Sequence, residues 1–165
     1  RLIAPILSFT AEEAWQIVNP GDDTIFIHTW HQFPPIAQEN ALLATWTEIR
    51  AFRSEVLKKL EDARAAGIIG SSLQAEVEIR ANGNKHDVLA ALKDDLRFVM
   101  ITSQAGITRV SSQGAESIVV APSSHKKCER CWHYRADVGA DAAHADICGR
   151  CVANLYGAGE PRAFA

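Results

Sequence analysis

The chain has 165 residues, 47% of them hydrophobic and 22% charged, and a formal net charge of −3. That length allows one domain or two small ones with an apolar core, and the charged fraction excludes wholesale disorder. No apolar run approaches the roughly 18 residues of a membrane-spanning helix and no signal-like segment opens the chain, so we expect a cytoplasmic protein with no membrane partner. Because the chain starts at Arg1 rather than Met, we expect it to be a piece of a longer protein.

Two helices are predicted in the first 70 residues. Thr10 and Glu13 form a capping-box pattern, which predicts a helix from about Thr10 to Val18. After a segment at residues 25–30 that is predicted to be extended, a longer helix is predicted over residues 38–66, because apolar side chains recur there at steps of three and four. This apolar stripe consists of Leu42, Trp46, Ile49, Val56, Leu60 and Ala63.

Arg53 interrupts this stripe. We expect it to pair with an acidic side chain in a helical bundle, and a nucleic acid is its alternative partner. A long amphipathic helix needs other elements to cover its apolar face. The chain offers too few of them, so we expect part of the bundle to lie outside it.

The middle of the chain has the pattern of a small α+β module. Residues 75–80 alternate apolar and polar side chains, which predicts a half-buried strand. A turn at residues 82–84 leads to a predicted helix over residues 87–96 and then to short strands. Those strands are predicted at residues 98–102, 107–110 and 117–121. The module spans about 50 residues, near the lower limit for independent folding.

All four cysteines lie in the last quarter of the chain, with the spacing C-x2-C-x16-C-x2-C. They are Cys128, Cys131, Cys148 and Cys151. Four thiolates in two tight pairs close a tetrahedral zinc site with no open position, so we predict one structural Zn²⁺ in a zinc ribbon that depends on the metal for folding. Two disulfides are disfavoured because cytosolic thiols stay reduced. A redox dithiol is also disfavoured, because such motifs come singly. The histidines nearby are not needed as ligands; they are His125, His133 and His144.

A basic and aromatic run surrounds the first cysteine pair. With zinc bound, the thiolates and the ion contribute −4 and +2, so the formal net charge changes from −3 to −5, which argues against broad attraction to nucleic acid. The local run is nevertheless basic, and its cations alternate with rings, as on surfaces that bind unstacked bases. The candidate nucleic-acid contacts are Trp132 and Arg130 first, followed by Lys127, Tyr134 and Arg135.

Each of these candidates has an alternative interpretation. Trp132 would cover the zinc site as a small core, and the charge run would be a solvated face. Arg130 lies between two ligands and is expected to point outward, toward a phosphate or a base edge. The turn at residues 70–72 has no preceding strand and no following Lys, so we interpret it as backbone geometry rather than as a phosphate cradle.

Several segments resemble bacterial isoleucyl-tRNA synthetase, a class Ia aminoacyl-tRNA synthetase. KCERCWHY and DICGRCVANLYGAGEPRAFA resemble its C-terminal zinc-binding segment, GIIGSSLQAEVEI and LRFVMITSQAGI resemble its C-terminal junction, and LIAPILSFTAEEAW is similar to a bundle segment of the wider class. The resemblance implies an α+β chain in three parts. These are the end of an anticodon-binding, partial antiparallel helical bundle (1–69), a small α+β junction module (70–124) and a four-cysteine zinc domain with the C-terminal tail (125–165).

The resemblance also implies a function. The parent enzyme activates isoleucine with ATP and attaches it to its tRNA, and this chain would bind zinc and the anticodon arm of the isoleucine tRNA. HIGH-like and KMSKS-like signatures are absent from the sequence and no editing domain fits, so we expect no catalytic residue and no ATP site here. The expected partners are that tRNA and the rest of the synthetase, not DNA, and the expected state is a monomer. Two departures from the family, Gln74 in place of a frequent Glu and Ala145 in place of a frequent Pro, touch no predicted ligand.

Two other classes of function compete with this interpretation. DNA-lesion glycosylases also end in a C-x2-C…C-x2-C finger with a basic residue that contacts DNA. That interpretation leaves the helical bundle and GIIGSSLQAEVEI unexplained. A ribbon that binds another protein, with no nucleic-acid partner, is the third hypothesis.

Overall fold

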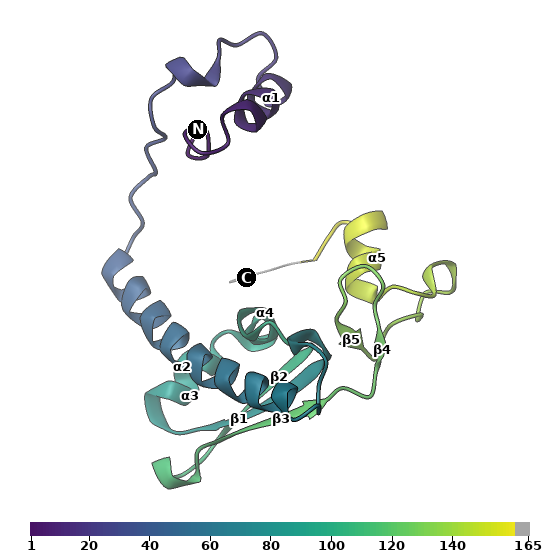
Figure 1. Ribbon diagram of the computed structural model, residues 1–165. Helices are drawn as coiled ribbons and strands as arrows, with labels where there is room; N and C mark the ends of the chain where they lie inside the picture. Colours follow the sequence, from purple (N-terminus) through teal and green to yellow (C-terminus); the bar gives the residue numbers. More distant parts are fainter. Residues whose placement is uncertain (161–165) are drawn as a thin grey trace. The chain divides into compact units, whose positions relative to one another are not determined.

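A computed structural model describes residues 1–160, and the predictions for residues 161–165, at the end of the C-terminal tail, lie outside the described residues. The chain divides into two compact units, residues 1–39 and residues 40–165. Figure 1 shows the elements of both. Among residues 1–160, none of the helices combines the length and the apolar character needed to cross a membrane.

The first unit folds around a small apolar cluster. Its helix α1 (Ser8–Val18) contributes Ala11, which packs with Ile25. The Ile25 N–H donates to the Glu12 carboxylate over 2.9 Å, and this bond lowers the pKa of Glu12 below its ordinary value. It also fastens the 3-10 turn η1 (Ile25–Ile27) to the helix.

Two sequence predictions for this unit are wrong. Helix α1 starts two residues before Thr10, with Leu7 at the N-cap and no side-chain cap, so the predicted capping box is not used. The chain is already turning at that point, because the Leu7 N–H bonds to the Ile3 carbonyl and the Ala11 N–H to the Leu7 carbonyl, each over 2.8 Å. The segment predicted to be extended begins instead with η1.

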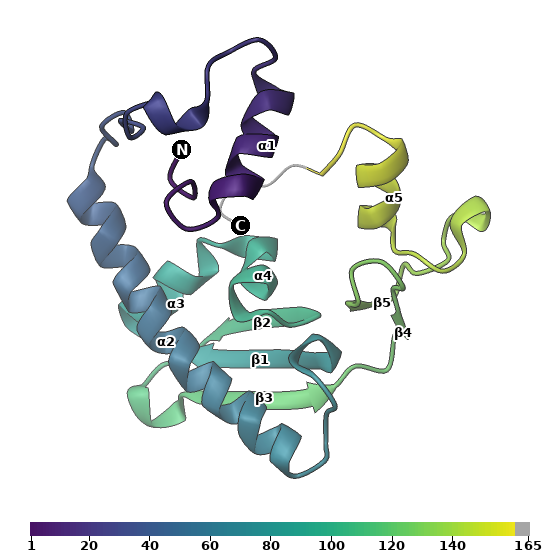
Figure 2. The ribbon, with the colours of Figure 1, turned by 45° about the horizontal axis from the view of Figure 1, so that its top comes forward.

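Helix α2 (Glu39–Ala65), the long helix that the sequence predicts, belongs to the second unit except for its first residue. A three-stranded sheet and two short helices follow (Figure 2). Their bounds, with those of the 3-10 turns, are η2 (Ser72–Gln74), β1 (Ala75–Ala81), α3 (Gly83–Ala90), η3 (Lys93–Asp95), α4 (Leu96–Met100), β2 (Gln104–Arg109), η4 (Gln113–Ala115) and β3 (Ser117–Pro122). The strand order is β2-β1-β3, with β1 parallel to β2 and antiparallel to β3.

One apolar core joins α2 to this sheet. Alternate residues of β1 are buried, among them Val77 and Ile79. Helix α2 adds Val56 and Leu60 to the same core, and α4 adds Met100. From Trp46 onward, the predicted apolar stripe of α2 therefore packs in the core with the sheet, which α2 crosses in Figure 2, whereas Leu42 is exposed. The partial antiparallel bundle stays a prediction.

The segment after β1 differs from its prediction in three places. The single helix predicted over residues 87–96 is interrupted, because α3 ends at Ala90 and α4 starts at Leu96. The predicted turn at residues 82–84 opens α3 rather than only reversing the chain. Residues 98–102, predicted as a strand, instead complete α4: Leu96 and Met100 are both buried at a helical spacing of four, and Ile101 ends the helix with a left-handed φ of 58°. The strand itself begins later, at Gln104.

Arg53 bonds to a backbone carbonyl rather than to the acidic side chain predicted for it, and its alternative nucleic-acid partner stays a prediction. Its Nε donates over 2.7 Å to the Val99 carbonyl, which lies in the last turn of α4, where carbonyls lack an intrahelical donor. The charged interruption of the apolar stripe thus fixes α2 to α4.

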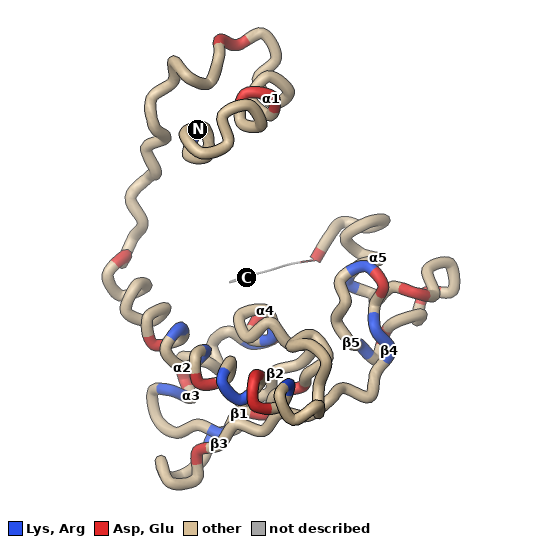
Figure 3. Tube along the Cα trace, in the orientation of Figure 1, with Lys and Arg blue, Asp and Glu red and all other residues tan. Residues whose placement is uncertain are grey.

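The last described segment is a small finger. Strands β4 (Lys126–Lys127) and β5 (Tyr134–Arg135) form an antiparallel hairpin. A 3-10 turn, η5 (Ala142–His144), then leads to α5 (Gly149–Tyr156). Figure 3 shows that Lys and Arg positions mark β4 and β5. Helices, two small sheets and a cluster of four cysteines confirm the predicted α+β class and fit a zinc ribbon.

Candidate metal centre and nucleic-acid interface

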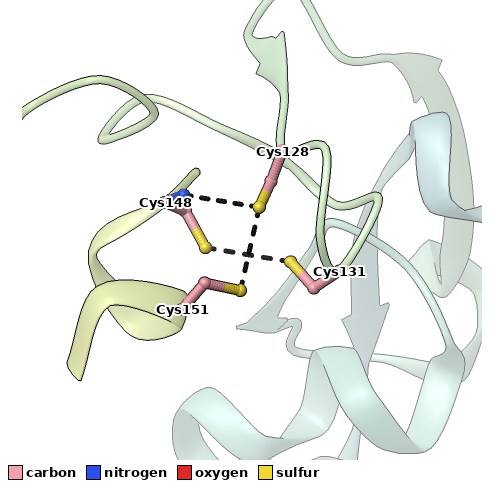
Figure 4. Close-up of side chains that lie close together, drawn as sticks. All are labelled: Cys128, Cys131, Cys148 and Cys151. Atoms are coloured by element: carbon pink, nitrogen blue, oxygen red, sulfur yellow. Dashed lines mark hydrogen bonds between the residues drawn. The ribbon is translucent and has the colours of Figure 1, made fainter. Parts of the chain in front are cut away.

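The four cysteine sulfurs converge on one point, as Figure 4 shows. All four Sγ atoms lie within 4.8 Å of one another. The Cys128–Cys151 and Cys131–Cys148 sulfur pairs are 3.7 and 3.8 Å apart, far beyond the ~2.05 Å of a disulfide. Because a Zn–S bond is ~2.3 Å long, a tetrahedron of thiolates around zinc has edges of ~3.8 Å. The cluster therefore fits a Zn²⁺ ion with every position taken by sulfur.

Backbone hydrogen bonds fix the first cysteine pair. The Cys128 N–H donates to the His133 carbonyl and the Trp132 N–H donates to the Cys128 carbonyl, each over 2.9 Å. The turn that they close holds Trp132 at a left-handed φ of 64°. The ring that follows the second ligand is thus carried by a closed turn between β4 and β5.

The second cysteine pair opens helix α5. Cys148 is its N-cap and Cys151 lies in its first turn. The Cys148 N–H points at Cys128 Sγ over 3.4 Å, which ties the two pairs together. The Gly149 N–H donates to Asp137 Oδ2 over 3.1 Å, and a Cβ at this position would lie 2.9 Å from that oxygen, so a larger residue would displace the Asp137 side chain.

The backbone favours a thiolate at Cys128. Burial alone raises its pKa, but backbone N–H groups, chiefly those of Cys131 and Cys148, outweigh burial and bring the pKa of Cys128 to about 6. Burial raises the pKa of Cys131 and of Cys148 above the ordinary value. A divalent ion deprotonates such thiols outright, so the four-thiolate form goes together with a bound metal.

The five predicted nucleic-acid contacts do not form one group. Lys127, Trp132 and Tyr134 line a single hollow on the finger. Trp132 is 60% exposed, and the apolar side chains that pack on the cysteines are instead Val138 and Ile147.

The two predicted arginines lie elsewhere. Arg130 is exposed, yet its Nη1 lies 3.5 Å from Cys151 Sγ and donates toward this ligand rather than pointing only outward. Arg135 Nη1 donates over 3.5 Å to the Ser103 carbonyl. Both guanidinium groups thus have partners within the chain.

Sequence reasoning missed two further arginines beside the cysteines. The guanidinium carbons of Arg97 and Arg150 lie 4.6 and 4.8 Å from the centroid of the Phe98 ring, and both residues line a small cavity with Arg135. Burial is the largest cause that lowers the pKa of Arg97, and the charges of Arg135 and Arg150 lower it further. Arg150 occupies in CGRC the place that Arg130 occupies in CERC, and this symmetry in the sequence could have identified it.

Two family models match the chain. The model of the anticodon-binding domain of tRNA ligase matches residues 1–79. The model of a zinc finger found in FPG and IleRS matches residues 126–154. Because the finger model is shared by two families, the match to the anticodon-binding domain is what separates the synthetase from the glycosylase hypothesis.

Isoleucine–tRNA ligases match the chain almost from end to end. The enzyme of Janthinobacterium sp. (strain Marseille) is 60% identical over 100% of this chain, and that of Paraburkholderia xenovorans is 58% identical over 100%. The enzyme of Bordetella pertussis is 56% identical over 98%. This chain belongs to the isoleucine–tRNA ligase family. It spans 18% of the length of these relatives. The resemblance seen in the sequence is confirmed, and the glycosylase hypothesis is not favoured.

Proposed function

We propose that this chain is the tRNA-binding region of an isoleucine–tRNA ligase and that it contacts the anticodon arm of the isoleucine tRNA. The observation that carries the proposal is a combination: a match to an anticodon-binding domain occurs in the same chain as a finger with an exposed ring beside a cation. Lys127 Nζ lies 5.6 Å from the centroid of the Trp132 ring. Four sulfur ligands leave no position for a reacting molecule, which favours a binding role over chemistry.

The remaining parts of the proposal follow the family. Residues 1–69 form the end of the anticodon-binding bundle, residues 70–124 the junction module and residues 125–165 the zinc domain, with one Zn²⁺ per chain. The whole enzyme uses ATP to activate isoleucine and attach it to the tRNA, while this region supplies no catalytic residue and no ATP site. The protein is a cytoplasmic monomer, in keeping with four cysteines that remain unpaired.

The zinc ion would be held by the four cysteines and would cross-link two turns that lack an apolar core of their own. That cross-link places Trp132 on a closed turn, where its ring is available for stacking. Unpaired loop bases are recognised by stacking on rings and by contacts to their edges, and phosphates are recognised by cations. Lys127, Tyr134, Arg130 and Arg135 supply the remaining ring and the cations.

The binding proposal is tested with the zinc-loaded chain and a transcript of the isoleucine tRNA at fixed salt. We expect tighter binding to this tRNA than to one with a changed anticodon or to a duplex with an abasic site. Preference for the duplex, or no binding to tRNA, overturns the proposal. Binding that is unchanged when Lys127→Glu and Arg130→Glu are combined would favour a protein-interaction ribbon instead.

Trp132→Ala should weaken tRNA binding by about 1–3 kcal/mol, because the chain loses one base–aromatic stack. Trp132→Phe is the matched control: it keeps a ring on the same turn and should retain most of the affinity. Zinc content is measured in both variants. A dissociation constant that Trp132→Ala leaves unchanged would reject the stacking role.

A further inference from the structure

A hollow of about 390 Å³ lies between two segments that are distant in the sequence. One wall is the finger, with Lys127, Trp132 and Tyr134. The other wall is the crossing from α2 to β1, which the sequence suggested to be only backbone geometry; it consists of Gly70, Ser71, Leu73 and Gln74. The volume is within the range of about 300–1,000 Å³ in which small-molecule ligands bind.

Ser103 fixes the two walls relative to each other. It is completely buried. Its Oγ donates to the Leu73 carbonyl on one wall and accepts the Tyr134 N–H over 2.6 Å on the other. A single hydroxyl thus bridges the crossing and the finger, so the hollow has a defined width.

Gln74 fixes the shape of the second wall. The side-chain Oε1 of Gln74 accepts the Gly70 N–H over 2.7 Å. The backbone N–H of Gln74 donates to the Ser71 carbonyl over 3.0 Å. A Glu carboxylate, the frequent residue at this position according to the resemblance, would accept the same bond from Gly70. Gly70 and Ser71 are themselves exposed, and both line the hollow.

Among residues 1–160, one permanent charge lines the hollow. It is that of Lys127, whose Nζ lies near the exposed Trp132 ring. Adjacent strand residues point to opposite sides, and Lys126 accordingly points elsewhere, with its Nζ 3.0 Å from an Asp146 carboxylate oxygen. A ring, one cation and a polar backbone wall match a ligand with one flat face and one anionic group.

From these contacts we infer that the hollow binds one unstacked nucleotide of the RNA: the base stacks on Trp132, its phosphate contacts Lys127, and the turn at Gly70–Ser71 encloses it from the other side. This inference rests on the proposed tRNA-binding function and deepens it, because it assigns the crossing as part of the binding site. The nucleotide must be unpaired, since a paired base has no free face to place on the ring.

The first test fills the hollow from its second wall, the crossing from α2 to β1. Ser71→Leu places a larger side chain in the hollow at an exposed residue whose side chain makes no cap bond. Ser112→Leu is the matched control: Ser112 is also an exposed N-cap of a 3-10 turn with no cap bond, and its backbone is extended in the same way (φ −144°, ψ 155°, against −152° and 160°). With the zinc-loaded chain and the isoleucine tRNA transcript, we expect Ser71→Leu to weaken binding about tenfold or more and Ser112→Leu to leave it unchanged. Equal affinities of the two variants overturn the inference.

The second test measures the phosphate contact through its salt dependence. Lys127→Met should reduce the slope of log Kd against log salt by about 0.7, the contribution of one single-strand phosphate contact. Lys126→Met removes the same charge from the neighbouring residue and should leave the slope unchanged. If the two variants have equal slopes, Lys127 makes no phosphate contact and the nucleotide site is rejected.

These outcomes distinguish the two proposals from each other. If the unaltered chain does not bind the tRNA, the proposed function fails and the nucleotide site fails with it. If the chain binds the tRNA and Ser71→Leu has no effect, the function stands and the site is rejected. Gln74→Leu should lose affinity, because a Leu side chain cannot accept the Gly70 N–H; an affinity equal to that of the unaltered chain would contradict the role of the turn.

Discussion

The sheet module and the finger are neighbours in one unit, yet they are stabilised in opposite ways. Among the described residues, the module buries fourteen apolar ones in one core, which belong to α2, β1, the short helices and the segments that connect them. In the finger the buried cluster consists of three cysteines, with partly buried Cys131, Val138 and Ile147 against it. Apolar burial stabilises the first region, whereas the second has too little of it. The comparison shows that a metal can take the place of a core where the chain is too short to form one.

Removing the metal should have the largest effect. A chelator, or Cys148→Ser, should unfold the finger, because a structural zinc contributes about 10–16 kcal/mol of apparent binding free energy at neutral pH. Amide spectra should lose the dispersed signals of residues after Lys126 and keep those of α2 and the sheet. Added zinc should restore the chelated chain but not the variant. A spectrum that the chelator leaves intact would contradict the comparison.

Opening a cavity in the sheet module should destabilise the module and leave the zinc content of the finger unchanged. Leu60→Ala removes a side chain that is 1% exposed and should lower the free energy of unfolding by about 2–5 kcal/mol. Leu43→Ala, on the same helix but 53% exposed, should change it by less than about 0.5 kcal/mol. The zinc content of both variants, measured by mass spectrometry, should equal that of the unaltered chain. Loss of zinc from Leu60→Ala would show that the two regions fold as one.

The hydroxyl that joins the two regions should have a smaller effect. Ser103→Ala leaves two part-buried backbone groups, the Leu73 carbonyl and the Tyr134 N–H, without this partner and should cost about 1–3 kcal/mol. Its particular signature is faster hydrogen exchange at the Tyr134 amide. Thr102→Val is the matched control, because Thr102 is equally buried but donates to the Gln104 carbonyl and not to the finger. Equal exchange at Tyr134 in the two variants would contradict the bridging role.

The smallest effect expected is an acid-sensitive contact at the far end of the sheet. Glu116 accepts the Asn82 N–H over 2.9 Å and a bond from Lys85 Nζ over 3.0 Å, and these bonds lower the pKa of Glu116 below 4.5. Because the folded pKa is depressed, its stabilisation is present above the unfolded pKa and is lost as the pH falls through the folded value. Glu116→Gln should therefore flatten the acid limb of a stability–pH curve below about pH 4.5. If Glu116→Gln leaves the acid limb of the curve unchanged, the two bonds of Glu116 do not contribute to this pH dependence.

Local patterns explain what the sequence could predict. The metal centre was predictable because the spacing of the four cysteines already defines a closed ligand set. Helix α2 was predictable because apolar side chains recur at helical spacing along most of its 27 residues. Short elements were not: α4 has five residues, and its Phe98 and Val99 are residues typical of strands. Thr10 and Glu13 form a valid cap pattern, but the preceding residues had already started the helix.

Contacts between distant segments explain the rest. Nothing near Arg53 indicates that its partner is a carbonyl of α4. The hollow was missed for the same reason, since its walls are joined by Ser103, which is close to neither of them in the chain. Single-sequence reasoning found the residues of the finger wall and could not find the wall opposite.

The left-handed backbone of Trp132 has a consequence for how this finger can vary. A bulky residue at such a φ costs about 1–2 kcal/mol, and glycine would adopt it without that cost. Trp132→Gly would therefore relax the turn and leave it without a ring. Under the proposed function, the strained turn is retained because it holds the indole where an RNA base can contact it.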